Sequence, residues 1–142
     1  YADEQTGLHK WHADPDDPAA GRELAVFAST GYRGDREGIG IYARPDGTGF
    51  IVCVDQTPGD STFHVYRREG EPGRPHDHSR EVAAFRVGAD STDGLEVTSA
   101  PIDPDFPRGV MVAMNSSGRN FLLVRWADIE ALVGSRPGSS IQ

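Results

Sequence analysis

Short apolar or alternating runs, separated by turn residues, recur along almost the whole chain. Residues 62–67 (Thr-Phe-His-Val-Tyr-Arg) alternate polar and apolar side chains, which indicates a strand with one buried face and one wet face. Residues 127–133 show a helical pattern, and Asp128 near its start is favourable for the helix dipole. The pattern therefore predicts an all-β chain with one terminal helix. The strands are predicted at 8–13, 23–28, 38–43, 49–54, 62–67, 81–87, 94–98, 109–114 and 120–126.

Two segments of the sequence occur twice in the same order. Residues 22–27 (Arg-Glu-Leu-Ala-Val-Phe) recur as 80–85 (Arg-Glu-Val-Ala-Ala-Phe), and 37–41 (Glu-Gly-Ile-Gly-Ile) recur as 93–97 (Asp-Gly-Leu-Glu-Val). A long period carried by short strands is typical of blades or arrays. Four of the predicted strands fall within 38–87, which is enough for one blade. We therefore predict antiparallel four-stranded blades, about 2.5 of them, as part of a β-propeller.

So few blades cannot close a ring, and an unclosed propeller exposes a sheet edge. We therefore expect the isolated chain to be inactive or weakly structured unless it associates with the remaining blades of a parent protein. The opening residues Tyr1-Ala2-Asp3 lack an initiator Met and resemble the end of a strand, so we expect a longer parent. The predicted domains are a partial propeller over 1–133 and a disordered Gly/Ser-rich tail over 134–142.

Charge narrows the classes of partner. The formal net charge is -8 and the pI is about 5.0. This acidity argues against nucleic acid as a partner, because proteins that bind it neutralise phosphates with a basic face, and it favours cations instead. The longest apolar runs are too short to span a membrane, so we expect no membrane partner. The single cysteine, Cys53, lies in an apolar strand and is expected to be a buried structural thiol.

Acidic side chains occupy matching places in the repeat. In a propeller, these places converge at one end of the central channel, where carboxylates close together repel each other unless a cation holds them. Hard oxygen donors arranged in this way suit calcium. The simpler alternative is that these carboxylates are solvated residues of turns. A turn, however, requires only the glycine of Asp-Gly, and it does not explain why a carboxylate recurs at the same place in each blade. The residues concerned are Asp3, Glu4, Asp35, Glu37, Asp55, Gln56, Asp90, Asp93 and Glu96.

Histidines offer a weaker candidate site. His76-Asp77-His78 contains two imidazoles of the type that bind transition metals. The segment lies between prolines and glycines, and we expect a solvated loop. His9, His12 and His64 fall within or beside predicted strands, where a structural role is the more common one.

Several segments match, in order, the motifs of one protein family. Residues 35–42 are similar to its Asp-Ile-Glu-Gly-Leu-Thr-Ile-Tyr, and 91–97 are similar to its Asp-Thr-Asp-Gly-Ile-Asp-Val. Residues 120–126 resemble its closing Asn-Phe-Lys-Met-Val-Pro-Trp. Residues 1–11 resemble an acidic strand end followed by Ile-Trp-Lys-Phe, and Gln56 stands in place of the Gln of Ser-Gln-Gly-Asn. The chain thus resembles the β-propeller phytases, also called alkaline 3-phytases.

The resemblance implies a six-bladed, calcium-dependent propeller, with this chain as its C-terminal part. The implied activity is hydrolysis of phosphate monoesters of phytate (myo-inositol hexakisphosphate), and the implied localisation is secreted or periplasmic. Calcium would bridge carboxylates to phosphates and lower the pKa of a bound water. The implied catalytic residues, which are also metal ligands, are Glu4, Asp35, Glu37, Gln56 and Asp93. Their repeat positions add Asp90 and Glu96 as metal ligands. The expected partners are phytate or calcium-phytate and the remaining blades.

The sequence also departs from the family pattern. The acidic loop before Asp93 is shorter, so a further catalytic Asp is either lost or replaced by Asp90. His9 stands where the family has Trp, and Asn115 stands where it has Asp. Two alternatives therefore stay open: a non-catalytic, calcium-stabilised propeller segment or scaffold, and a calcium lactonase-like propeller.

Overall fold

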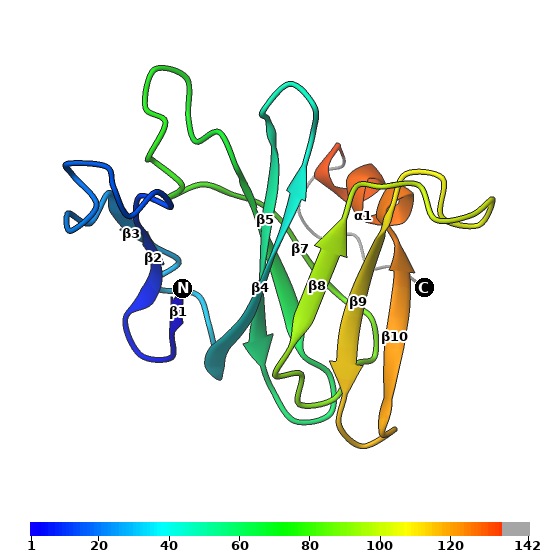
Figure 1. The fold of residues 1–142 in the computed structure, drawn as a ribbon. Helices are drawn as coiled ribbons and strands as arrows, with labels where there is room; N and C mark the ends of the chain where they lie inside the picture. The colour runs from blue at the N-terminus through cyan, green and yellow to red at the C-terminus, as the bar shows by residue number, and fades with distance from the viewer. Residues whose placement is uncertain (135–142) are drawn as a thin grey trace.

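The computed structural model describes residues 1–134, which form three antiparallel sheets and one short helix (Figure 1). The sheets have the strand orders β1-β2-β3, β4-β5-β6-β7 and β10-β9-β8. The predicted all-β class and its antiparallel blades are confirmed, whereas residues 135–142 of the tail predicted over 134–142 lie outside the described residues. The elements are β1 (Ala2–Asp3), β2 (Gly7–Lys10), β3 (Ala25–Phe27), β4 (Asp35–Ala43), β5 (Gly49–Gln56), β6 (Thr62–Arg67), β7 (Glu81–Arg86), β8 (Leu95–Thr98), β9 (Val110–Asn115), β10 (Asn120–Arg125) and α1 (Trp126–Val133).

Strand register confirms the repeat. Leu8 of β2 lies opposite Phe27 of β3, as Phe63 of β6 lies opposite Phe85 of β7. The first sheet therefore corresponds to the outer three strands of the central sheet, and among residues 1–134 it has no counterpart of the innermost strand β4. The third sheet begins with a counterpart of β4, namely β8, and has three strands. One four-stranded sheet flanked by two three-stranded sheets fits the expected partial propeller.

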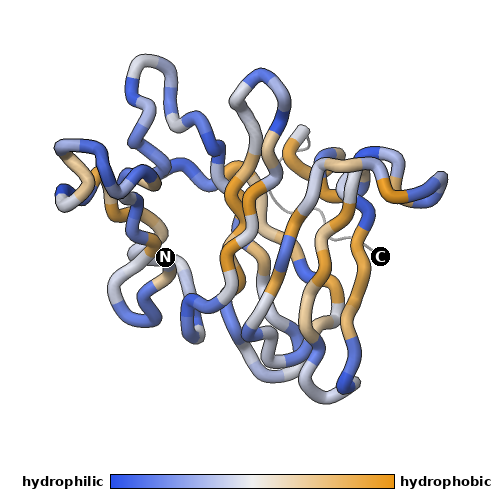
Figure 2. The backbone as a smooth tube through the Cα atoms, viewed as in Figure 1, coloured by the Kyte–Doolittle hydropathy of each residue, from blue (hydrophilic) through white to orange (hydrophobic). Residues whose placement is uncertain are grey.

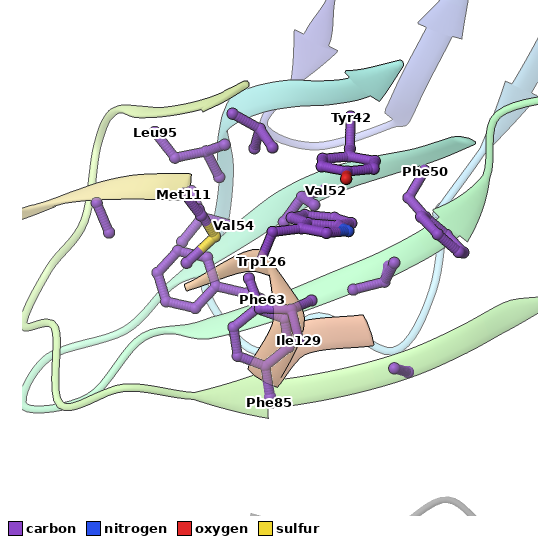
Figure 3. Close-up of a cluster of buried hydrophobic side chains, with 14 of the residues drawn as sticks. Tyr42, Phe50, Val52, Val54, Phe63, Phe85, Leu95, Met111, Trp126 and Ile129 are labelled. Atoms are coloured by element: carbon purple, nitrogen blue, oxygen red, sulfur yellow. The ribbon is translucent and has the colours of Figure 1, made fainter. Parts of the chain in front are cut away.

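The larger core lies between the central and third sheets and is closed by α1 (Figure 3). Trp126, the first residue of the helix, is fully buried, and its ring stacks on Tyr42 with centroids 3.9 Å apart. The Tyr42 hydroxyl donates to the carbonyl oxygen of Arg108 at 2.9 Å. The helix is also held by its Glu130 carboxylate, which pairs with Arg44 and Arg108 at 2.5 Å each. The helix thus fastens the third sheet to the central one.

A smaller core joins the first sheet to the central one. Figure 2 shows apolar positions concentrated in the strands and polar positions in the loops between them. The buried residues of this core are Leu8, Phe27, Ala28, Ile51, Cys53 and Tyr66. Cys53 is free and buried, as the sequence predicts. Within residues 1–134, no helix has the length and apolar character that a membrane span requires.

The loop at 76–78 is only partly solvated, contrary to the prediction. His76 is exposed, but His78 is only 2% exposed, so the prediction of a solvated loop is wrong for His78. Its Nδ1 donates to the carbonyl oxygen of Arg67 at 2.7 Å, and its ring centroid lies 4.8 Å from that of Phe27. The Lys10 ammonium donates to its Nε2 at 2.8 Å. The imidazole therefore packs as a structural group between the first two sheets.

Candidate functional site

The innermost strands of the central and third sheets, β4 and β8, lie side by side (Figure 1). The backbone N–H of Gly38 donates to the carbonyl oxygen of Asp93 at 2.7 Å. A Cβ at Gly38 would lie 2.7 Å from the Leu95 nitrogen, and one at Gly40 would lie 2.6 Å from the Leu95 Cδ1. The Gly-x-Gly pattern of β4 therefore permits the close approach of the two strands, and this approach brings Glu37 close to Asp93.

Five polar residues lie near the starts of β4 and β8. We call them the acidic cluster: Glu4, Asp35, Glu37, Gln56 and Asp93. Burial raises the pKa of Glu37, and the negative charges of Glu4, Asp93 and Asp35 raise it further. Gln56 lies opposite Asp35 in the pairing of β4 with β5, and its Nε2 donates to Asp93 Oδ1 at 2.5 Å. The structure thus brings together, from all three sheets, the residues that the sequence resemblance implies as catalytic.

Arg36 braces the acidic cluster from behind. It lies between Asp35 and Glu37 in the strand, yet it is only 7% exposed. Its guanidinium donates to the carbonyl oxygens of Ala28 at 2.6 Å and Glu4 at 3.0 Å. These bonds tie the first sheet to the start of β4, and so they fix the backbone of Glu4 relative to the two neighbouring carboxylates.

Asp55 holds the turn that leads into β4. Its carboxylate, 2% exposed, accepts from the backbone N–H of Arg33 at 3.0 Å and of Gly34 at 2.7 Å. Asn115, at the end of β9, uses its side-chain oxygen in the same way and accepts from the N–H of Asp90 at 3.1 Å. The central and third sheets therefore each hold the turn before the innermost strand with a side-chain oxygen from the next strand. Sequence reasoning did not find this role, although both residues end a strand of the repeat.

Asp90 and Glu96 are not brought into the acidic cluster. One Asp90 oxygen accepts from the N–H of Gly59 at 2.5 Å, and this bond is the largest cause of the lowered pKa of Asp90. The Glu96 carboxylate accepts from the N–H of the next residue, Val97, at 2.8 Å. Neither is among the charges that act on Glu37. Their predicted role as metal ligands stays a prediction, and the structure gives Asp90 a bracing role between loops.

The donor chemistry of the acidic cluster fits calcium. The metal-binding atoms of its four carboxylates and one amide are all oxygens, and hard cations prefer oxygen ligands. The acidic cluster contains no thiolate or imidazole, which would favour zinc. Among residues 1–134, no three His, Cys, Asp or Glu side chains already converge closely enough to hold a metal. Glu4, Asp35 and Asp93 are exposed, so their side chains can turn towards an ion without disturbing the core.

Comparison with known proteins identifies sequence relatives. A family model described as Phytase matches residues 1–139. A 3-phytase from Bacillus subtilis (strain 168) is 26% identical over 151 residues, which cover 96% of this chain and 37% of the relative. The chain thus spans well under half the length of that relative.

Proposed function

Because the chain belongs to the phytase family, we propose that it contributes a calcium-binding acidic end to an enzyme that hydrolyses phosphate monoesters of phytate. The observation that carries the proposal is the convergence of Glu4, Asp35, Glu37, Gln56 and Asp93 from three separate sheets. Carboxylates that repel one another, as Glu4, Asp35 and Asp93 repel Glu37, are stabilised by a cation. The similarity to a 3-phytase supports the choice of substrate.

The residues of the acidic cluster have distinct tasks in this proposal. Glu37, partly buried among like charges, is the carboxylate that gains most from a bound cation, because the cation offsets both burial and repulsion. Gln56 holds the Asp93 carboxylate through its amide and so limits the directions in which that ligand can point. Bound calcium would supply positive charge for phosphoryl oxygens and would lower the pKa of a coordinated water.

In this proposal the substrate binds to calcium and not to the neighbouring Arg36. Arg36 is buried, and its guanidinium already donates to two backbone carbonyl oxygens. Phytate is a polyanion, and the chain has a formal net charge of -8, so phytate or calcium-phytate would approach through calcium. Further blades of the propeller complete the site in this proposal, and a secreted or periplasmic location, where free calcium is abundant, is part of it.

Phosphate release tests the proposed activity. The protein that carries these residues is incubated with phytate in calcium, in EGTA, and in EGTA followed by excess calcium. We expect release in calcium, loss in EGTA and recovery when calcium is restored. Release that is unchanged by EGTA would overturn the calcium dependence, and hydrolysis of lactones or other esters in place of phytate would overturn the substrate class.

A non-catalytic, calcium-stabilised scaffold is the second candidate. The observation that favours it is the inward position of Arg36, which leaves the acidic cluster without that basic group to contact phosphate. Under this alternative, calcium raises the melting temperature of the protein while phytate stays intact. The same calcium series, read by thermal unfolding and by phosphate release, separates the two functions.

A further inference from the structure

His64 is buried between two carboxylates. It lies on β6, which runs between β5 and β7 in the central sheet, and it is only 6% exposed. Its Nδ1 donates to Glu81 Oε2 at 2.5 Å, and its Nε2 lies 3.9 Å from Asp55 Oδ2. Asp55 belongs to β5 and Glu81 begins β7, so a carboxylate from each neighbouring strand faces one nitrogen of the ring.

The Nε2 atom of His64 has an unusual environment. It is buried, and within residues 1–134 it has no hydrogen-bond partner. Buried polar atoms nearly always have one, so this atom requires another source of stabilisation. The negative charge of Asp55 supplies it, because a carboxylate at this distance attracts an N–H group strongly in a buried place. The same oxygen, Oδ2, accepts from the N–H of Arg33 at 3.0 Å. The imidazole therefore acts on the carboxylate that holds the turn before β4.

His64 also contacts the residue that lies under Arg36. The imidazole stacks on the ring of Tyr32, with centroids 4.2 Å apart and an interplanar angle of 25°. The guanidinium carbon of Arg36 lies 4.5 Å from the centroid of the same Tyr32 ring, which is a cation–π contact. Arg36 in turn donates to the carbonyl oxygen of Glu4. One side chain thus touches a residue of each of the two braces that fix the acidic cluster.

We propose that His64 is a positioning residue of the acidic cluster. With an N–H on each ring nitrogen, it is anchored by Glu81 and holds Asp55, since carboxylates only accept hydrogen bonds. Through Asp55 it fixes the start of β4, and through Tyr32 it supports the guanidinium that fixes the backbone of Glu4. The effect on calcium rests on the proposed function, whereas the hold on the turn before β4 does not.

Two substitutions separate the two sides of the ring. His64→Asn keeps an amide about where Nδ1 lies, facing Glu81, and removes the group that faces Asp55. His64→Gln keeps an amide about where Nε2 lies, facing Asp55. Both variants remove the aromatic stack on Tyr32. They therefore differ mainly in the carboxylate that they leave without a partner.

Amide hydrogen exchange, followed by NMR without calcium, tests the hold on the turn. The N–H groups of Arg33 and Gly34 donate to Asp55, so their exchange reports whether that carboxylate stays in place. We expect exchange of these two amides to be about tenfold faster in His64→Asn than in the wild type. In His64→Gln, it should be at least about threefold slower than in His64→Asn.

Isothermal titration with calcium tests the effect on the acidic cluster. We expect His64→Asn to bind calcium roughly fivefold more weakly than the wild type, and His64→Gln to regain most of this loss. Val65→Ala is the matched control. Val65 is the next residue of β6, is 0% exposed and packs in the larger core. This change should lower the melting temperature and leave both the exchange of the turn amides and the calcium affinity unchanged.

The outcomes that overturn the proposal are distinct. Unchanged exchange at Arg33 and Gly34 in both His64 variants would refute it, and so would equal exchange in the two variants. Val65→Ala with the same losses as His64→Asn would show that His64 contributes only general packing. Faster exchange with unchanged calcium affinity would overturn the role in the acidic cluster. If the wild type itself binds no calcium while His64→Asn still speeds the exchange, the proposed function fails and the hold on the turn stands.

Discussion

The amide of Gly38 donates to the carbonyl oxygen of Asp93 at 2.7 Å, and this bond fixes the innermost strands of two neighbouring blades to each other. The bond is made by the backbone, so the closeness of Glu37 to Asp93 does not depend on a bound ion. Like charges are thereby held together by the fold. An arrangement of this type is unfavourable without a cation and is therefore a suitable basis for a cation site.

Gly38→Ala should destabilise the chain. The added Cβ would lie 2.7 Å from the Leu95 nitrogen and 2.9 Å from the Asp93 carbonyl oxygen, so the two strands would have to separate. Overpacking of this kind costs about 1–3 kcal/mol in the free energy of unfolding. Urea denaturation measures the loss.

Gly94→Ala is the matched control, because Gly94 in the third sheet is the repeat equivalent of Gly38 in the central sheet. A Cβ there would have nothing within 4 Å. The change should therefore be nearly neutral, or slightly stabilising through the lower entropy of the unfolded chain. If the two substitutions destabilise the chain equally, the close approach of β4 and β8 is not the reason why position 38 needs a glycine.

The strand pattern was predictable because it is local and repeated. Each of the predicted strands has a counterpart in the structure, and the helix predicted at 127–133 begins one residue earlier, at Trp126. The strand β1, Ala2 and Asp3, was anticipated only as the end of a strand, because two residues are too few to show a period of two.

The bracing of the acidic cluster could not be predicted from local pattern. The bond from Gly34 to Asp55 joins residues 21 positions apart, and the bond from Arg36 to Glu4 joins residues 32 apart. Position in the repeat also grouped Glu96 with Asp93 as predicted metal ligands. Successive residues of a strand point to opposite faces, so Glu96 and its neighbour Leu95 leave β8 on different sides. Chain distance alone does not carry that information.

Asp55→Ala should lower stability more than Asp55→Asn. Alanine leaves the N–H groups of Arg33 and Gly34 without their acceptor, and a hydrogen bond to a charged acceptor contributes about 1.5–3 kcal/mol. Asparagine keeps one oxygen, which is the acceptor that Asn115 already uses in the third blade. Urea midpoints of the two variants measure the difference, and an alanine variant as stable as the asparagine variant would contradict the role assigned to Asp55.

Glu37→Gln should weaken calcium binding by roughly tenfold, because affinity for calcium follows the number of ligand charges. The matched control is Glu96→Gln, which removes one carboxylate of the same type outside the acidic cluster. Isothermal titration with calcium compares the two proteins, and their melting temperatures without calcium check that both are folded. If the control loses as much affinity as Glu37→Gln, the ion is bound elsewhere or only by net charge.

Cys53 should resist labelling in the folded chain and should make stability fall at alkaline pH. The thiol is 0% exposed, and burial raises its pKa to about 11, against about 8.5 for a free cysteine. Above about pH 8.5 the unfolded chain releases this proton and the folded chain keeps it, so stability is full below that pH and falls as pH rises towards about 11.

Urea denaturation at about pH 8 and about pH 9.5 should therefore show a loss of roughly 1 kcal/mol from this thiol, before the buried tyrosines titrate. A disulfide-exchange reagent should label Cys53 only in urea. The Cys53→Ala variant, although less stable at both pH values, should lose less stability between them because it lacks the titrating group. The same pH dependence in wild type and variant, or rapid labelling without urea, would show that the smaller core around Cys53 is open to solvent.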